Sequence, residues 1–320
     1  MALGEFELIA RYFDRASPRG DVLLGVGDDA ALLEVPAGQA LVAATDTLVE
    51  GRHFLPGTEP DAVGHQALAV NLSDLAAMGA TPAWSLLSLS LPAADEAWLE
   101  GFARGFHRLA GRYGVALVGG DTVRGPLVIT VEVLGFVETA LALRRRGARP
   151  GDLLFVSGWP GEAAAGLRQL LAPGSGSVDP ALLRRLRYAE PRIELGRRLR
   201  GVATAAMDVS DGLLGDLARL CSASGVGAVV ELDSLPLSPA LKAAFAPGDC
   251  ERLVLQGGDD YELLFCVPAA RSEAVAALAT PSCPLTCIGR IETGAGVRGL
   301  RHGLEVPIAE GGYDHFRPAP

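Results

Sequence analysis

Apolar residues in the first half of the chain recur at spacings that alternate between helical and extended periods. The longest helical pattern covers 61–78, where Leu68, Leu72 and Leu75 repeat every three or four residues. Serine and leucine alternate over 83–91, which predicts a strand with one exposed face. The remaining patterns predict helices over 6–13 and 95–113, the second capped by Asp95, and strands over 22–26, 30–35, 41–45, 115–118 and 127–136.

The second half begins after a charged boundary, rich in arginine and bearing proline and glycine, at 144–152. A strand over 153–157 and a helix over 162–171 follow, and a flexible loop is expected at 173–180. An apolar segment over 205–208 then leads into a helix over 213–224. Strands over 226–232, 263–267 and 287–291 interleave with helices near Leu241 and Val275. The fold class is therefore α+β, with two domains at 1–143 and 150–320.

The 320 residues and the 49% hydrophobic content are sufficient for two packed cores. The formal charge of −10 argues against non-specific binding to nucleic acid. The first residues lack the basic start and apolar centre of a signal peptide, and no apolar run is long enough for a membrane span. Five cysteines without a Cys-x-x-Cys spacing favour a reduced, cytoplasmic protein.

Five short acidic clusters lie beside glycine or hydroxyl residues, and several of them follow apolar runs. We therefore expect carboxylates at the ends of strands or helices, where oxygen ligands can bind a hard cation. Convergent carboxylates repel one another unless a cation lies between them, so the set predicts magnesium and with it phosphate chemistry. The clusters are Gly27-Asp28-Asp29, Thr45-Asp46-Thr47, Gly119-Gly120-Asp121-Thr122, Asp208-Val209-Ser210-Asp211-Gly212 and Gly257-Gly258-Asp259-Asp260-Tyr261.

Each motif has a structural alternative when it is taken singly. Gly-Asp and Asp-Gly pairs commonly form turns. Asp208 or Ser210 would serve as the N-cap of the helix that begins at Leu213. Asp74 lies in an apolar segment, where it either binds a cation or, with Ser73, caps a fresh helical turn. A loop histidine such as His53, a run of linker arginines at 144–146 and an aromatic tail are more often structural than functional. The five clusters together favour the metal site.

Lys242 is the only lysine of the chain and lies in an ordinary helical pattern. A P-loop needs Gly-x-x-x-x-Gly-Lys-Ser/Thr, and a protein kinase needs a lysine on a strand beside the nucleotide phosphates. Neither arrangement is present. A bound nucleotide would therefore be held by metal ions, backbone amides and arginine.

With these clusters, further motifs closely resemble the thiamine-monophosphate kinase family over essentially the whole chain. They are Gly4-Glu5-Phe6, His53-Phe54-Leu55, the segment 69–80 around Asn71-Leu72-Ser73-Asp74, and Gly312-Tyr313-Asp314-His315-Phe316. The resemblance implies ATP-dependent phosphorylation of thiamine monophosphate to thiamine diphosphate. It also implies a homodimer, in which N-terminal ATP- and magnesium-binding domains contribute strands to a shared β-barrel, with the C-terminal α/β domains outside. Aminoimidazole ribonucleotide synthetase and selenophosphate synthetase belong to the same superfamily.

The resemblance also implies the site residues. Gly120, Asp121, Arg145 and Ser210 would contact ATP, while His53, Asp259 and Tyr313 would contact thiamine monophosphate. Several magnesium ions would be bound by Asp29, Thr45, Asp46, Asp74, Asp121, Asp208 and Asp211. No catalytic base is expected, because the acceptor is a phosphate whose second pKa is near 6 and which is mostly dianionic at neutral pH. Direct in-line transfer, assisted by metal and without a phosphoenzyme, is the expected reaction.

Two positions depart from the family pattern. Asp259 stands where a glutamate is usual, and Ala44 stands where a hydroxyl residue often precedes Thr45. Two other functions are disfavoured. Sister synthetases carry a catalytic cysteine or lysine in an N-terminal glycine-rich loop, and this chain has neither before Cys221. A calcium-binding module would need an Asp-x-Asp-x-Asp-Gly loop, which is not present.

Overall fold

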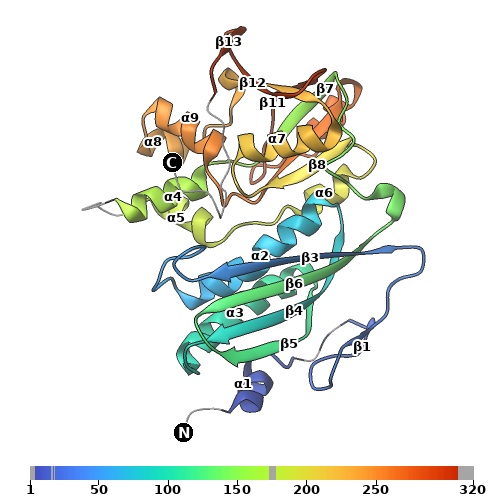
Figure 1. Cartoon of the computed structure of the whole chain (residues 1–320), viewed down its shortest axis with the longest axis vertical. Coiled ribbons are helices and arrows are strands. Elements are labelled where there is room, and N and C mark those ends of the chain that lie inside the picture. Colours follow the sequence, from blue (N-terminus) through green and yellow to red (C-terminus); the bar gives the residue numbers. More distant parts are fainter. Residues whose placement is uncertain (1–3, 16, 18, 173–177, 309–320) are drawn as a thin grey trace. The chain divides into compact units, whose positions relative to one another are not determined.

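The computed structural model of the protein describes residues 4–15, 17, 19–172 and 178–308, and its backbone divides into two compact units (Figure 1). The first unit comprises residues 1–75 and 80–140, and the second comprises 76–79 and 141–320. Each unit contains helices and one main β-sheet. The prediction of two parts that both mix helices with strands is confirmed.

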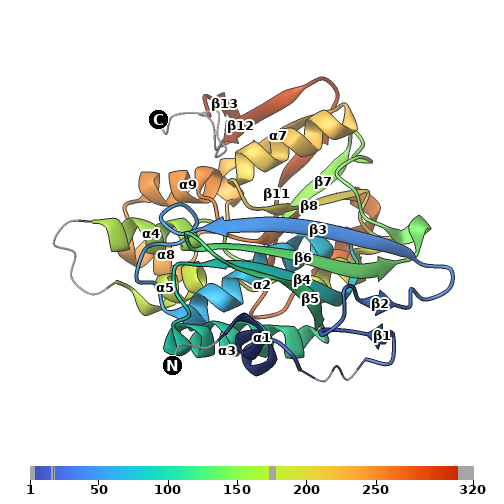
Figure 2. The ribbon, with the colours of Figure 1, turned by 60° about the horizontal axis from the view of Figure 1, so that its bottom comes forward.

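The main sheet of the first unit has four strands in the order β3-β6-β4-β5 (Figure 2). β4 and β5 are parallel, and helix α3 joins them, whereas the other neighbouring strands are antiparallel. A parallel pair requires such a crossover, because a tight turn can join only antiparallel strands. The bounds are Ala40–Val49 for β3, Thr81–Leu91 for β4, Glu96–Tyr113 for α3, Ala116–Arg124 for β5 and Val128–Val137 for β6.

Helices α2 (Pro60–Ala77) and α3 cover one face of this sheet (Figure 2). Ile129, Val131 and Val133 of β6 face these helices and are almost completely buried. The two helices approach closely at glycines. A Cβ on Gly64 would lie 2.0 Å from the carbonyl oxygen of Phe102, and a Cβ on Gly105 would lie 1.9 Å from that of Asp61. This contact therefore needs glycine at both positions, and it places the first turn of α2 beside the middle of α3.

The opposite face of the sheet carries a smaller apolar cluster built around Trp84, Leu134 and Phe136. Residues of the short strands β1 (Val22–Leu24) and β2 (Leu32–Leu33) pack against it. On the edge strands, Leu41 and Val123 point from the same face and are 47% and 49% exposed. We refer to this side of the sheet as the open face. An exposed apolar surface of this kind commonly marks an interface.

The serine–leucine alternation of β4 gives one buried and one more exposed face over residues 85–91, which confirms the prediction. Ser85, Leu87, Leu89 and Leu91 are buried, whereas Leu86 and Ser90 are partly exposed and Ser88 is exposed. The more exposed residues, Leu86, Ser88 and Ser90, lie on the open face of the sheet. A strand with one face on the core and one face less covered is expected to alternate in this way.

The motifs around Asp46 and Asp121 lie inside strands, which corrects the expectation that they end them. The β3 ladder with β6 continues to Val49, and β5 continues to Arg124 along β4. The predicted strands 41–45 and 115–118 were too short, because backbone pairing with a neighbouring strand continues through the polar residues.

The second unit contains a seven-stranded sheet in the order β13-β12-β9-β11-β7-β10-β8. β9 and β12 are parallel, and the other pairs are antiparallel. The strand bounds are Asp152–Ser157 (β7), Ala205–Val209 (β8), Gly227–Glu231 (β9), Glu262–Pro268 (β10), Leu285–Glu292 (β11), Gly296–Arg301 (β12) and Leu304–Val306 (β13).

The helices of the second unit confirm several predicted bounds. The predicted helices 162–171 and 213–224 are α4 (Glu162–Leu171) and α7 (Leu213–Ser224), and α7 packs into the main core of the unit. Most of the predicted loop 173–180 lies outside the described residues. The other helices are α1 (Glu5–Tyr12) in the first unit and α5 (Pro180–Arg187), α6 (Ile193–Leu199), α8 (Pro239–Ala244), α9 (Pro247–Gln256) and α10 (Ser272–Ala276) in the second.

Candidate active site

Thr45 and Asp46 lie in the middle of the edge strand β3. The N–H of Asp46 donates to Oδ1 of Asn71 on α2 at 2.8 Å, and Nδ2 of Asn71 donates to the carbonyl oxygen of Ala67 at 3.0 Å. Asp74 is half-buried and follows Asn71 by three residues, so both lie on one side of α2. Asn71 therefore holds the centre of β3 beside the part of α2 that carries Asp74.

Ser73 and Asp74 lie inside α2, which runs without a break from Pro60 to Ala77. The alternative that they cap a fresh helical turn is therefore wrong. Ser73 is completely buried, whereas Asp74 is not. Partial exposure lowers the cost of keeping the Asp74 carboxylate charged on this otherwise apolar helix.

A row of oxygen-bearing side chains crosses the open face of the sheet. Thr47 is paired with Thr130, Thr130 with Ser88, and Ser88 with Asp121. The hydroxyls of Thr47 and Thr130 are 2.8 Å apart, as expected for residues opposite one another on one face. Asp46 precedes Thr47 and therefore points to the helix-covered side. Within one chain, Asp46 and Asp121 therefore lie on opposite faces of this sheet.

Gly120 lies on β5 with φ 150°, and a Cβ there would be 1.8 Å from the carbonyl oxygen of Leu87. A side chain is therefore excluded. Gly120 is exposed, and β5 is an edge strand of this sheet. A ligand can thus approach the backbone directly beside the Asp121 carboxylate.

His53 lies in the turn after β3 and is half-buried. Its Nδ1 accepts a hydrogen bond from the N–H of Val49 at 3.0 Å. In the neutral ring the proton must then be on Nε2. Asp29 lies in the exposed segment between β1 and β2, and its N–H donates to Oδ1 of Asp28 at 2.8 Å.

In the second unit, the segment from Asp208 to Gly212 joins β8 to α7. Gly212 is the N-cap residue of α7, with φ 113° and no side-chain cap. The alternative in which Asp208 or Ser210 caps the helix is therefore wrong. Asp216, one turn inside α7, instead accepts the N–H groups of Ser210 and Asp211 on its Oδ2, at 3.0 and 3.1 Å.

The carboxylates around this loop repel one another. Asp216 is completely buried, and burial together with the charge of Asp208 raises its pKa to about 6, with a smaller contribution from Asp211. Arg219 opposes this, because its Nη1 lies 2.5 Å from Oδ1 of Asp216 and 2.7 Å from Oδ2 of Asp211. One arginine thus partly balances three carboxylates.

The segment Gly257–Tyr261 lies directly beside this loop. The N–H of Asp259 donates to the carbonyl oxygen of Ser210 at 2.9 Å, and that of Tyr261 to Val209 at 2.8 Å. Asp259 and Tyr261 have positive φ angles of 65° and 52°. This left-handed backbone conformation costs energy for residues other than glycine. The phenol of Tyr261 donates to Oδ1 of Asp259 at 3.2 Å. The predicted substrate residue Asp259 therefore lies beside the predicted metal and ATP residues of the β8–α7 loop.

The pKa of Asp259 is raised to about 6, chiefly by burial and to a smaller extent by the charge of Asp211, while the hydrogen bond from Tyr261 opposes the rise. The next residue, Asp260, is almost completely buried and accepts the N–H of Gly161 at 2.7 Å, while its Oδ1 lacks a hydrogen-bond partner. Burial raises the pKa of Asp260 well above its usual value. The buried Asp260 thus ties the segment Gly257–Tyr261 to the backbone at Gly161.

Glu262 anchors the same segment at the start of β10. Its carboxylate is completely buried and is bound by Arg192, by Arg185 at 2.7 Å and by the hydroxyl of Ser157 at 2.5 Å. Burial alone would raise the pKa of Glu262, but the charges of Arg192 and Arg185 and the hydrogen bonds from Arg192 and Ser157 together outweigh it, and the pKa is lowered. A buried ion pair of this kind is strongly destabilising to break, so it fixes the position of the segment.

Arg145 and Ser210 are not brought together in the second unit. The hydroxyl of Ser224, at the end of α7, donates to the carbonyl oxygen of Arg145 at 2.9 Å, whereas Ser210 precedes the start of that helix. The twelve residues of α7 span about 18 Å. The two residues therefore do not contact the same phosphate within one unit. Tyr313 lies outside the described residues.

The oxygen donor set suits magnesium in chemistry, and the crowded carboxylates of the second unit favour a cation nearby. Among residues 4–308, apart from the gaps named above, no group of three or more His, Cys, Asp or Glu side chains lies close enough to hold a metal ion. The predicted ligands are thus distributed between two units and, within the first, between two faces of a sheet.

Asp216 and Arg219 were missed by the sequence prediction. The available signal was an aspartate in the otherwise apolar start of a helix, Leu213-Leu214-Gly215-Asp216-Leu217, followed by an arginine three residues later. That spacing indicates an ion pair on one side of a helix. It does not show that the aspartate reaches back to bind the preceding loop.

The chain matches two family models in succession. Residues 27–137 match the AIR synthase related protein N-terminal domain, and residues 149–300 match the C-terminal domain of the same family. The thiamine-monophosphate kinase of Escherichia coli K12 is 49% identical over 325 residues, covering 99% of each chain. That of Bacillus subtilis is 36% identical, over 98% of this chain and all of the relative.

Solved structures of relatives are similar to this chain as well, and two of them match most of its length. The crystal structure of thiamine-monophosphate kinase from Stenotrophomonas maltophilia K279a is 48% identical, with a TM-score of 0.84 over 89% of this chain and 92% of the other. The structure of AaThiL complexed with AMPPCP and TMP is 35% identical, with a TM-score of 0.77 over 88% and 89%.

Proposed function

The chain belongs to the AIR synthase related family, and from this premise we propose the function that its geometry supports best. It is a kinase that transfers the γ-phosphoryl group of ATP to thiamine monophosphate, giving thiamine diphosphate and ADP. The relatives above are named for this activity, and one of them is described in complex with AMPPCP and TMP. The absence of a lysine-based phosphate site in this chain agrees with a kinase that relies on metal ions.

One observation carries the proposal. The β8–α7 loop and the segment Gly257–Tyr261 are joined by two backbone hydrogen bonds, from Asp259 to Ser210 and from Tyr261 to Val209. This contact sets three carboxylates, Asp208, Asp211 and Asp259, around one end of the sheet. A kinase with two anionic substrates needs such a place, where bound cations offset the charge of both.

Magnesium suits the donor set, and Asp29, Thr45, Asp46, Asp74, Asp121, Asp208 and Asp211 are the residues that would hold several ions. Bound magnesium would offset the repulsion between the phosphates of ATP and of the acceptor. Asp46 and Asp74 then act from the helix-covered side of the first unit, and Asp29 and Asp121 from its exposed loops and edge. No side chain is needed as a base, because the acceptor phosphate is already dianionic.

The remaining residues bind and orient the substrates. The backbone at Gly120, with Asp121, Arg145 and Ser210, would contact ATP. His53 would donate from Nε2 to the phosphate of thiamine monophosphate, while Asp259 and Tyr313 would lie near its cationic part. Asp259 is one methylene shorter than the usual glutamate of the family, and its strained backbone brings that shorter side chain to a fixed position.

We further propose a homodimer in which the open face of the first unit is covered by the same face of a second copy. Leu41 and Val123 support this, because both are about half exposed on that face. Two four-stranded sheets placed face to face would form the shared β-barrel, with the N-terminal domain at 1–143 and the C-terminal domain at 150–320. Size-exclusion chromatography with light scattering tests it, and a Leu41→Glu/Val123→Glu variant should be monomeric.

Localisation in the cytoplasm is the remaining part of the proposal. All five cysteines are free thiols, which suits a reducing compartment. No helix in the described part of the chain is long and apolar enough to cross a membrane.

The activity is tested by incubating the purified chain with ATP, magnesium chloride and thiamine monophosphate, and separating the thiamine compounds by chromatography. Thiamine diphosphate and ADP should form in equal amounts. Free thiamine and adenosine monophosphate serve as control acceptors and should give no product. Release of phosphate from ATP without thiamine diphosphate would refute the assignment.

A further inference from the structure

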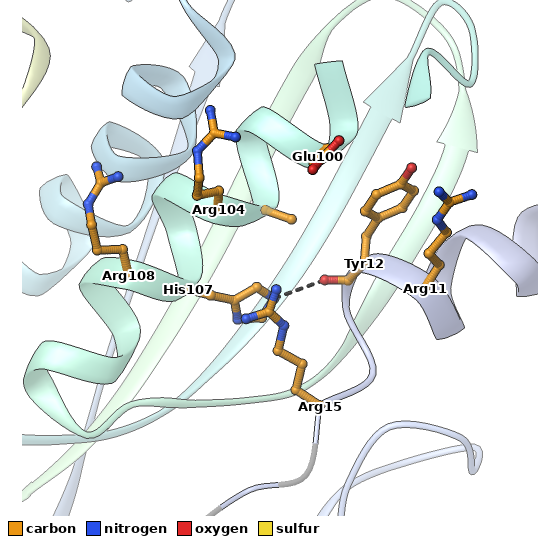
Figure 3. Close-up of a pocket in the computed structure, with 8 residues that line it drawn as sticks. Arg11, Tyr12, Arg15, Glu100, Arg104, His107 and Arg108 are labelled. Atoms are coloured by element: carbon orange, nitrogen blue, oxygen red, sulfur yellow. Dashed lines mark hydrogen bonds between the residues drawn. The ribbon is translucent and has the colours of Figure 1, made fainter. Parts of the chain in front are cut away.

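A hollow of about 580 Å³ lies in the first unit between α1 and α3 (Figure 3). Helix α3 contributes residues spaced three or four apart, which places them on one side of that helix. The end of α1 and the segment after it form the other wall. The lining consists of Glu100, Ala103, Arg104, His107 and Arg108 from α3, and of Arg11, Tyr12 and Arg15.

Four arginines and one glutamate line this hollow, although the chain as a whole has a formal charge of −10. The acidic partners of three arginines lie outside the lining. Arg11 pairs with Glu96 at 2.8 Å, while Arg104 and Arg108 share Asp61 of α2, at 3.1 and 2.8 Å.

These ion pairs hold the guanidinium groups in place without using all of their donors. Each guanidinium has five N–H groups, of which Arg11 uses one and Arg104 one in these contacts. The side chains of Arg11, Arg104 and Arg108 are still 51–61% exposed. Donors on both walls therefore remain accessible to an anion.

Arg15 has no acidic partner among the residues that the structure describes. Its side chain lies beside the ring of His107 (Figure 3). Nε2 of His107 is 2.9 Å from the carbonyl oxygen of Tyr12, and since a carbonyl only accepts, Nε2 carries the proton. Burial lowers the pKa of His107, and the charge of Arg15 lowers it further. The floor of the hollow is thus a neutral histidine beside an unpaired cation.

The hollow is separate from the candidate active site. The Asp61 that holds Arg104 and Arg108 is in the first turn of α2, and Asp74 follows thirteen residues later on the same helix. This separation corresponds to about 20 Å along the helix axis. None of the lining residues belongs to the predicted metal, ATP or substrate set.

We propose that this hollow binds a small molecule that carries two neighbouring anionic groups, with a diphosphate as the chemistry that fits it best. Planar guanidinium groups on two walls can each bind a different phosphate through paired N–H donors. The volume exceeds the needs of a single phosphate, whereas Glu100 at the lining disfavours a long polyanion such as nucleic acid. The proposal rests on the first unit alone and stands independently of the kinase activity.

The test uses the full chain in EDTA, so that metal-dependent binding at the candidate active site does not contribute. Inorganic pyrophosphate is titrated while the histidine side-chain resonances are followed by NMR, with His107 assigned through a His107→Gln variant. We expect a saturable shift of the His107 resonances. We also expect a rise in the pKa of His107, because a bound anion offsets the charge of Arg15.

An Arg15→Gln/Arg104→Gln variant should weaken this binding about ten-fold or more, since it removes one donor group from each wall. Arg108 retains two hydrogen bonds of 2.8 Å to Asp61, so the helix contact is preserved. The matched control is Arg184→Gln/Arg198→Gln, which makes the same change of charge on exposed helical positions of the second unit. Its pyrophosphate affinity should equal that of the unmodified chain.

Further ligands distinguish the source of the anion. Binding of thiamine diphosphate or ADP more tightly than pyrophosphate would support an organic diphosphate, and the reverse order would support inorganic pyrophosphate. Orthophosphate should bind at least about ten-fold more weakly than either. Equal affinity for orthophosphate, equal loss in the control variant, or no saturable shift up to roughly 10 mM pyrophosphate would each overturn the proposal.

Discussion

Replacement of Asp216 by asparagine should change how the stability of the metal-free protein depends on pH. The buried carboxylate of Asp216 has its pKa raised from 3.8 to about 6, by burial first and then by the charge of Asp208. The folded state therefore holds the proton more tightly than the unfolded state. Stability is gained as the pH falls through 6 and is complete below 3.8, and it is lost again as the pH rises.

The magnitude follows from that difference in pKa. A shift of about two units corresponds to roughly 3 kcal/mol between pH 8 and pH values below 3.8. About 2 kcal/mol of this should already be gained at pH 4.5. Asparagine has no carboxyl proton to bind, so Asp216→Asn lacks this gain while occupying nearly the same volume.

The assay is urea unfolding of both proteins in EDTA at pH 8 and at pH 4.5. The unmodified chain should become about 2 kcal/mol more stable relative to Asp216→Asn on acidification. Groups that titrate in this range without interacting with Asp216 contribute equally to both proteins and cancel in the comparison. A difference in unfolding free energy that stays constant within about 0.5 kcal/mol across this range would refute the reasoning.

Three further predictions concern the candidate active site. Asp46→Asn or Asp74→Asn should lower kcat by about 10²-fold or more, measured by product formation, while circular dichroism shows that the protein stays folded. Near-normal turnover at saturating magnesium would contradict the metal assignment. Asp259→Glu should be tolerated and should lower the KM for thiamine monophosphate, whereas a change confined to the KM for ATP would place it on the other substrate. Tyr313→Ala should weaken binding of thiamine monophosphate by about three- to thirty-fold in calorimetry, because an aromatic contact with a cation is worth roughly 0.5–2 kcal/mol. Tyr313→Phe should have a mild effect, and an unchanged Kd for Tyr313→Ala would exclude the contact.

The sequence by itself determined the local elements and much of the chemistry. Helices 162–171 and 213–224 and the cap at Asp95 were predicted correctly, because helical periodicity and capping depend on residues only a few positions apart. The single lysine excluded two kinase classes, because each of them requires a lysine at a defined place in its motif. The acidic motifs indicated the residues that carry the chemistry, and their resemblance to a known family indicated the reaction.

Tertiary structure decided which of these residues meet. Asp46 and Asp121 were predicted to belong to one set, but the register across β3, β6, β4 and β5 places them on opposite faces of a sheet. Asp216 was unremarkable in sequence, yet it binds the loop that carries Ser210 and Asp211. Strand register and loop contacts join residues far apart in the chain, and they depend on packing of the whole core, which no local pattern of side chains encodes.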